Sequence, residues 1–181
     1  MNTGTSQLTL EYILLGLLRA QPRHGYALYK KVQSTPELSL IWHIKRSKLY
    51  YLLEKLENEE LLTVQVSSQG SYPDRKIYRL TEQGEREFQK WVHTPVQSGR
   101  HVRVEFLSKL FFVLQESQPA AVELIRAQQG TCRSWVDSLE KQLVEQEDAD
   151  FISRQVFAFR IGQIEAMIDW LENCHLQLPE G

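Results

Sequence analysis

Residues 46–59 read RSKLYYLLEKLENE, with leucines at positions 49, 52, 53 and 56. Apolar residues spaced by three and four line one face of an α-helix. The spacing therefore predicts a helix over residues 46–59 that buries its leucines and turns its other side outward.

The polar side of this helix carries hydrogen-bond donors at its N-terminal end. Ser47, Lys48 and Tyr51 lie on or near the face opposite the leucines, and Lys45 and Arg46 stand beside them. A helix dipole disfavours each cation in the first turn by roughly 0.3–1 kcal/mol, and the phosphates of a nucleic acid would reverse that sign. The cluster therefore indicates either a nucleic-acid contact or a solvated group of charges.

Two further helices are predicted before this one. The periodicity of residues 10–18 predicts a helix that ends near Ala20, and residues 24–34 form a second one, which Thr35-Pro36 closes. Residues 38–44 are apolar and partly β-branched, which predicts a brief extended segment before the third helix.

A β-hairpin and a fourth helix follow. Residues 62–67 and 76–80 have strand-like patterns on either side of a polar loop, and Thr81 can cap a helix whose inner face holds Phe88, Trp91 and Val92. Three helices followed by a hairpin is the order of a winged helix-turn-helix, in which the third helix enters the DNA major groove. We therefore expect a mainly α chain with a small β-hairpin.

The loop of the hairpin places an aromatic residue and two cations at or near its tip. Such a tip can contact the sugars and phosphates of DNA. Lys and Arg also occur on ordinary edge strands, where they prevent pairing with another chain. Its residues are Gly70, Tyr72, Pro73, Asp74, Arg75 and Lys76.

The second part of the chain is predicted to be helical throughout. Pro95 and Gly99 lie in a polar stretch that divides a DNA-binding domain, residues 1–95, from a helical domain, residues 96–181. Apolar residues then recur at positions 104, 107, 111 and 114, and again from 125 to 143. We expect inner helix faces at these positions.

The last helix is more apolar than one neighbour requires, which predicts a homodimer; an intramolecular three-helix bundle is the alternative. The predicted interface residues are Phe157, Ile161, Ile164, Ile168, Trp170 and Leu171. Trp135 and Trp170 could line a pocket for a small aromatic effector, although core packing is the simpler explanation of both.

Charge and composition favour a local rather than a general polyanion-binding surface. Residues 1–100 contain 14 Lys and Arg against 10 Asp and Glu, a net +4, and residues 101–181 contain 7 against 13, a net −6. Cys132 and Cys174 have no zinc-ligand spacing, so we expect buried thiols and no metal or cofactor. The start of the chain has no signal-peptide pattern and no apolar run spans a membrane, which predicts a cytoplasmic protein.

An enzyme is the first rival interpretation. Ser138-Leu-Glu-Lys141 has the Ser-x-x-Lys spacing of some acyl-transfer enzymes, but the partner motifs of those enzymes are absent. We therefore expect no catalytic activity. The second rival is a winged-helix protein-interaction module that does not bind DNA.

The chain resembles the PadR family over about residues 8–95. The resemblance is carried by ILLGLL at 13–18, PRHGY at 22–26, LYYLLEKLE at 49–57 and KIYRLTEQG at 76–84. The stretch EFLSKLF at 105–111 is similar to the opening of the family's helical C-terminal domain, and Trp42 makes the chain look nearest to the longer members, which include phenolic-acid-responsive repressors.

The resemblance implies a dimeric transcription factor, usually a repressor, that binds a pseudo-palindromic double-stranded operator and releases it on a signal. It implies that Tyr26 and Lys30 meet phosphate, that Arg75 and Lys76 serve the wing, and that the groove residues are Ser47, Lys48, Tyr50 and Tyr51. Tyr50 also fits the edge of the core.

One residue departs from the family pattern. Where the family commonly has Gly after the third helix, this chain has Glu60. A left-handed Glu costs on the order of 1 kcal/mol, so we expect a longer helix or a shifted turn there.

Overall fold

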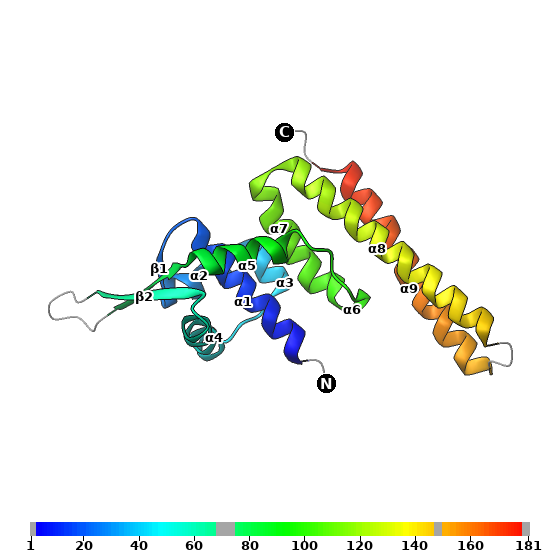
Figure 1. Cartoon of the computed structure of the whole chain (residues 1–181), viewed down its shortest axis with the longest axis horizontal. Coiled ribbons are helices and arrows are strands. Elements are labelled where there is room, and N and C mark those ends of the chain that lie inside the picture. Colours follow the sequence, from blue (N-terminus) through cyan, green and yellow to red (C-terminus); the bar gives the residue numbers. More distant parts are fainter. Residues whose placement is uncertain (1–2, 68–74, 147–149, 179–181) are drawn as a thin grey trace. The chain divides into compact units, whose positions relative to one another are not determined.

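The computed structural model describes residues 3–67, 75–146 and 150–178 (Figure 1). The chain divides into two compact units, Met1–His93 with His101–Phe112, and Thr94–Arg100 with Val113–Gly181. Residues 101–112 thus pack with the first unit, although they follow the polar stretch in the sequence.

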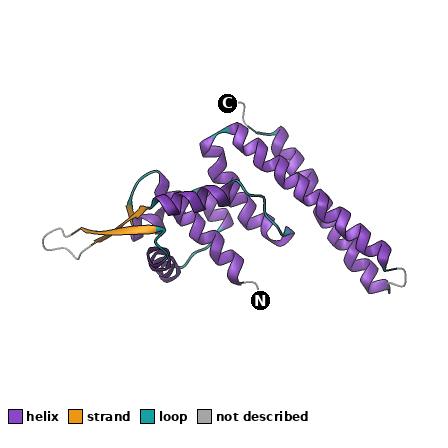
Figure 2. Ribbon diagram, in the orientation of Figure 1, coloured by secondary structure: helices purple, strands orange, loops and turns teal. Residues whose placement is uncertain are grey.

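The first unit has the predicted winged helix-turn-helix order, and the fold class is confirmed: the described residues are mainly helical, with one small antiparallel sheet (Figure 2). Its elements are α1 (Thr3–Arg19), β1 (Arg23–His24), α2 (Gly25–Ser34), α3 (Pro36–Ile41), α4 (Arg46–Asn58), β2 (Leu62–Ser67), β3 (Arg75–Leu80), α5 (Glu82–Val92), the π-helical η1 (Val102–Phe106) and the first part of α7 (Leu107–Glu116).

The core of this unit forms where α1 packs on α4, α5 and β3. The leucines of α4 are buried as predicted, with Leu49, Leu52 and Leu53 at 0% exposure. Thr81 caps α5 as predicted, because its hydroxyl accepts a hydrogen bond from the Gly84 N–H at 2.9 Å.

The predicted extended segment at residues 38–44 is wrong for most of its length, because Pro36–Ile41 is the short helix α3. Pro36 stands in the first turn, where its missing N–H is not needed, and Glu37 there complements the helix dipole. Only the residues after Ile41 are extended. Pro36 and Glu37, which favour the start of a helix, therefore predicted this stretch better than its apolar and β-branched composition did.

The expected longer helix or shifted turn at Glu60 is also wrong. Glu60 adopts a left-handed conformation, with φ 59°. The Leu61 N–H donates to the Leu56 carbonyl at 3.0 Å and the Glu60 N–H to the Glu57 carbonyl at 3.1 Å, which is the Schellman pattern. The helix end keeps its usual geometry without glycine because these two bonds satisfy its last carbonyls.

The predicted inner face at positions 104, 107, 111 and 114 is displaced. Leu114 is 40% exposed, and the buried residues of this stretch are instead Val102, Phe106, Ser108, Lys109, Phe112 and Val113. Apolar residues occur on several sides of this stretch, so their spacing did not identify the side that is buried.

The second unit is built on a helical hairpin of α8 (Gln118–Glu145) and α9 (Phe151–Leu176). Ser117 caps α8 and Asp150 caps α9; the Asp150 carboxylate accepts from the Ser153 N–H at 2.7 Å, which lowers the pKa of Asp150. Residues 94–100, which include the start of the single turn α6 (Gly99–His101), are held to α8 by Gln128. The Gln128 amide accepts from the Val96 N–H at 2.6 Å and donates to the Val96 carbonyl at 3.1 Å.

No helix of the described residues is long and apolar enough to cross a bilayer. Among the same residues, no group of three His, Cys, Asp or Glu side chains could hold a metal ion. Cys132 is buried and Cys174 is partly buried.

Candidate nucleic-acid interface

The outer side of α4 is exposed along the face opposite its leucines. Tyr51 is 53% exposed and Tyr50 37% exposed, and Arg46 and Ser47 are exposed beside them. Lys45 occupies the N-cap position without making a side-chain cap hydrogen bond. The end of the helix that attracts anions is therefore surrounded by cations.

These cations lie over tyrosine rings. The Arg46 guanidinium lies 5.3 Å from the centre of the Tyr26 ring and 5.7 Å from that of Tyr50. Lys30 lies over Tyr26 at 5.4 Å and Lys48 over Tyr51 at 4.8 Å. Cation–π contacts of this kind restrict long side chains, so the positive charges are partly ordered before any partner arrives.

A short strand that the sequence analysis missed joins α2 to the wing. β1 pairs antiparallel with β3, with Arg23 opposite Tyr78 and His24 opposite Ile77. His24 also caps α2, because its Nδ1 accepts from the Ala27 N–H at 3.2 Å. One dipeptide thus fixes both the start of α2 and the base of the wing.

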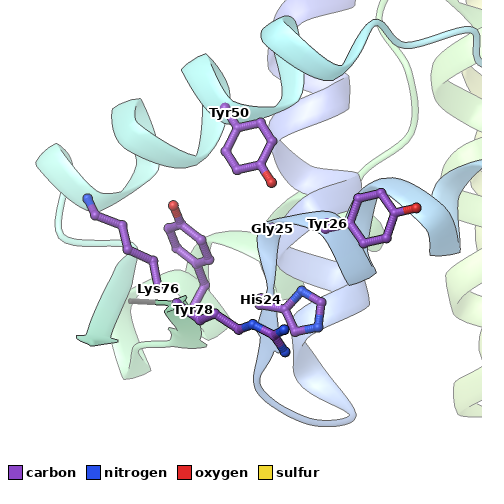
Figure 3. A pocket seen from close by; sticks show the side chains of 7 residues that line it. His24, Gly25, Tyr26, Tyr50, Lys76 and Tyr78 are labelled. Atoms are coloured by element: carbon purple, nitrogen blue, oxygen red, sulfur yellow. The ribbon is translucent and has the colours of Figure 1, made fainter. Parts of the chain in front are cut away.

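A pocket of about 640 Å³ opens between the start of α2, α4 and β3 (Figure 3). Among the described residues that line it none is acidic; they are His24, Gly25, Tyr26, Tyr50, Arg75, Lys76 and Tyr78. Burial, together with the nearby Glu57 carboxylate, raises the pKa of the Tyr78 hydroxyl above its usual range. The lining suits a negatively charged group that accepts hydrogen bonds.

Two ion pairs position α4. The Lys55 ammonium lies 2.9 Å from Glu11 of α1, whose side chain is 5% exposed, and this hydrogen bond raises the pKa of Lys55. Lys76 of β3 lies 3.4 Å from Glu57. α4 is therefore tied to α1 on its inner side and to the wing near its C-terminal end.

The structure brings most of the predicted DNA-binding residues to one side of the first unit. Tyr26, Arg46 and Tyr50 form one cluster, and Tyr50 also lines the pocket with Arg75 and Lys76. The wing-tip residues Gly70, Tyr72, Pro73 and Asp74 lie outside the described residues.

Sequence reasoning did not assign a role to His24, Gly25 or Tyr78, all of which line the pocket. The only sequence signal for the first two was their place in the motif PRHGY at 22–26.

The face of α9 predicted to meet a second copy is the one that packs on α8 within the single chain. Phe157, Ile164 and Leu171 are buried there, Ile161 and Ile168 are partly buried, and Trp170 is 36% exposed. Periodicity identifies an apolar face but not its neighbour, which is why the sequence alone left both alternatives open.

Trp135 is partly buried on α8 and lies beside Gly99. A β-carbon added to Gly99 would lie 3.8 Å from its Cζ3 atom and 3.7 Å from Met167.

Two family models match adjoining parts of the chain. The model described as transcriptional regulator PadR-like family matches residues 14–90, and that of the virulence activator alpha C-terminal region matches residues 102–178.

Individual relatives agree with the family models. The chain is similar to the negative transcriptional regulator PadR of Bacillus subtilis, with 29% identity over 175 residues, which are 91% of this chain and 94% of that protein. A crystal structure of B. subtilis PadR with operator DNA aligns with 92% of this chain and 97% of that one, at 27% identity and a TM-score of 0.45. Another, with p-coumaric acid, aligns with 97% and 98%, at 24% identity and a TM-score of 0.41. Residues 14–90 therefore form a domain of the PadR-like family of transcriptional regulators.

Proposed function

We propose that this regulator represses transcription by binding a specific DNA sequence as a homodimer, with α4 in the major groove. The main support for this proposal is the arrangement at the start of α4, where cations lie over exposed tyrosine rings. Its first turn, residues 46–49, contains no acidic residue. Such a surface attracts phosphates and presents guanidinium and ammonium donors to base edges.

The wing and α2 complete the proposed footprint. Tyr26 and Lys30 of α2 flank α4, and Arg75 and Lys76 of β3 lie across the pocket from them. Backbone contacts from both sides would fix the register of α4 in the groove. Lys45 and Ser47 would contribute near the start of the helix.

A second copy is proposed to dock on the outer face of α9. Ile152, Val156 and Phe159 are 67%, 51% and 66% exposed, and with Gln163, Ala166 and Trp170 they follow alternating spacings of four and three. This stripe, called here the outer stripe, has the pattern of a helix-pairing seam and lies away from the residues that face α8. The proposed dimer contact therefore moves from the buried face of α9 to the outer stripe, with Trp170 common to both.

The regulator is proposed to be a repressor because its B. subtilis relative is a negative regulator. A small aromatic molecule is the proposed releasing signal, with Trp135 and Trp170 as its candidate contacts. The compound to test first is p-coumaric acid, because a crystal structure of that relative is a complex with it. Quenching of tryptophan fluorescence together with DNA release would support this role, and an unchanged DNA affinity at saturating ligand would contradict it.

The proposal places the chain in the bacterial cytoplasm and includes no catalytic step. A protein-interaction module without DNA binding is the alternative, favoured by the net charge of −2 and the pI near 6.2.

Selection from random-sequence duplexes separates the two functions. The DNA-binding proposal expects an enriched inverted repeat whose half-sites are centred about 34–36 Å apart or a multiple of that spacing. No enrichment would favour the interaction module, and a single enriched half-site would contradict the dimer.

A further inference from the structure

Gly25, at the first residue of α2, lies directly against the side chain of Tyr50. A β-carbon built on Gly25 would lie 2.6 Å from Cε1 of Tyr50, 3.1 Å from Cζ and 3.3 Å from the hydroxyl oxygen. Figure 3 shows the Tyr50 ring reaching from α4 toward Gly25 and the start of α2. The ring occupies this position because residue 25 has no side chain.

The Tyr50 ring in turn holds Arg46. The two residues are one helical turn apart on α4, and the guanidinium of Arg46 also lies over the ring of Tyr26, which follows Gly25 in the chain. Arg46 therefore bridges α2 and α4 through two rings. Only one of these rings, that of Tyr50, depends on the space at Gly25.

We propose that Gly25 is a positioning residue for DNA binding: its missing side chain seats Tyr50, and Tyr50 orders Arg46 for contact with a DNA phosphate. The inference rests on the proposed function and extends it to a residue that would not itself touch DNA. The three atoms nearest to a β-carbon at position 25 belong to the outer end of the Tyr50 ring and not to the backbone. The ring can rotate away, so the change should displace Tyr50 and Arg46 without unfolding the unit.

The test compares Gly25→Ala with the wild-type chain on the duplex recovered by selection. Displacing Tyr50 removes one of the two ring contacts that order Arg46, which should weaken binding roughly three- to tenfold. The melting temperature should stay close to that of wild type. Gly130→Ala is the matched control, because a β-carbon there meets nothing within 4 Å, and its DNA affinity should be unchanged.

Two double variants test the route through Tyr50 and Arg46. In a Tyr50→Ala background the clash is absent, so adding Gly25→Ala should change the affinity less than about twofold; the same holds in an Arg46→Ala background. If Gly25→Ala alone does not fold, the Gly25→Ala/Tyr50→Ala chain should fold and bind like Tyr50→Ala.

A Gly25→Ala chain that binds DNA with wild-type affinity would overturn the inference. So would a loss of affinity on adding Gly25→Ala to Tyr50→Ala or Arg46→Ala that equals the loss in the wild-type chain. Failure of the Gly25→Ala/Tyr50→Ala chain to fold would also overturn it. Absence of any selected duplex for the wild-type chain would instead contradict the proposed function itself.

Discussion

At the scale of single residues, Glu60 shows that the chain retains a turn for which its side chain is poorly suited. A left-handed L-residue costs roughly 1–2 kcal/mol, and glycine avoids this cost but adds freedom to the unfolded chain. Glu60→Gly should therefore raise the free energy of unfolding by about 0.5–1 kcal/mol, measured by urea denaturation.

The neighbouring position provides the control. Glu59 has φ −85°, where glycine brings no relief, so Glu59→Gly should leave stability unchanged or lower it. Equal effects of the two substitutions would show that the left-handed turn carries no cost.

Among the elements, α1 and α4 are joined by an ion pair between the buried Glu11 and the partly exposed Lys55. Lys55→Ala would leave the Glu11 carboxylate, 5% exposed, without its cation. Because Lys55 itself is 31% exposed and water can partly replace it, we expect a loss of about 1–3 kcal/mol in unfolding free energy.

The pair between β3 and α4 should behave differently. Lys76 is 55% exposed in its contact with Glu57, so Lys76→Ala should change stability by less than about 0.5 kcal/mol. Similar losses from Lys55→Ala and Lys76→Ala in thermal or urea unfolding would be evidence against a special role of the α1–α4 pair.

Helices and strands with regularly spaced apolar residues were predictable from the sequence. Elements that form only through contact with another element were not. The leucines of α4 sufficed because they form one buried face, and the alternation of apolar and polar residues sufficed for β2. β1 contains two residues, too few for any pattern, and exists because β3 lies beside it. The stretch from Val102 to Leu114 is apolar on several sides, so its buried side depended on contacts with other elements and was misassigned.

The candidate DNA-binding site was likewise predictable only in part. Tyr51 followed from its place opposite the leucines, Arg46 from the cations of the first turn, and Tyr50 from the family resemblance. Gly25 and Tyr78 did not, because their roles depend on contacts between elements distant in the sequence.

At the scale of the whole molecule, the outer stripe of α9 predicts self-association. Phe159→Glu places a charge in the centre of this stripe and should give a monomer at micromolar concentration by sedimentation velocity, with unchanged helix content. Ala158→Glu adds the same carboxylate at an exposed position outside the stripe and should remain dimeric. A dimeric Phe159→Glu protein would place the interface elsewhere.

If the exposed side of α4 and the wing bind DNA phosphates, as proposed, DNA binding must depend on salt. Affinity for the selected duplex should fall steeply between low and moderate salt, and Lys48→Ala or Arg75→Ala should each reduce the slope of log K against log salt concentration by about one. Slopes identical to wild type in both variants, or binding insensitive to salt, would show that α4 and the wing do not bind DNA phosphates.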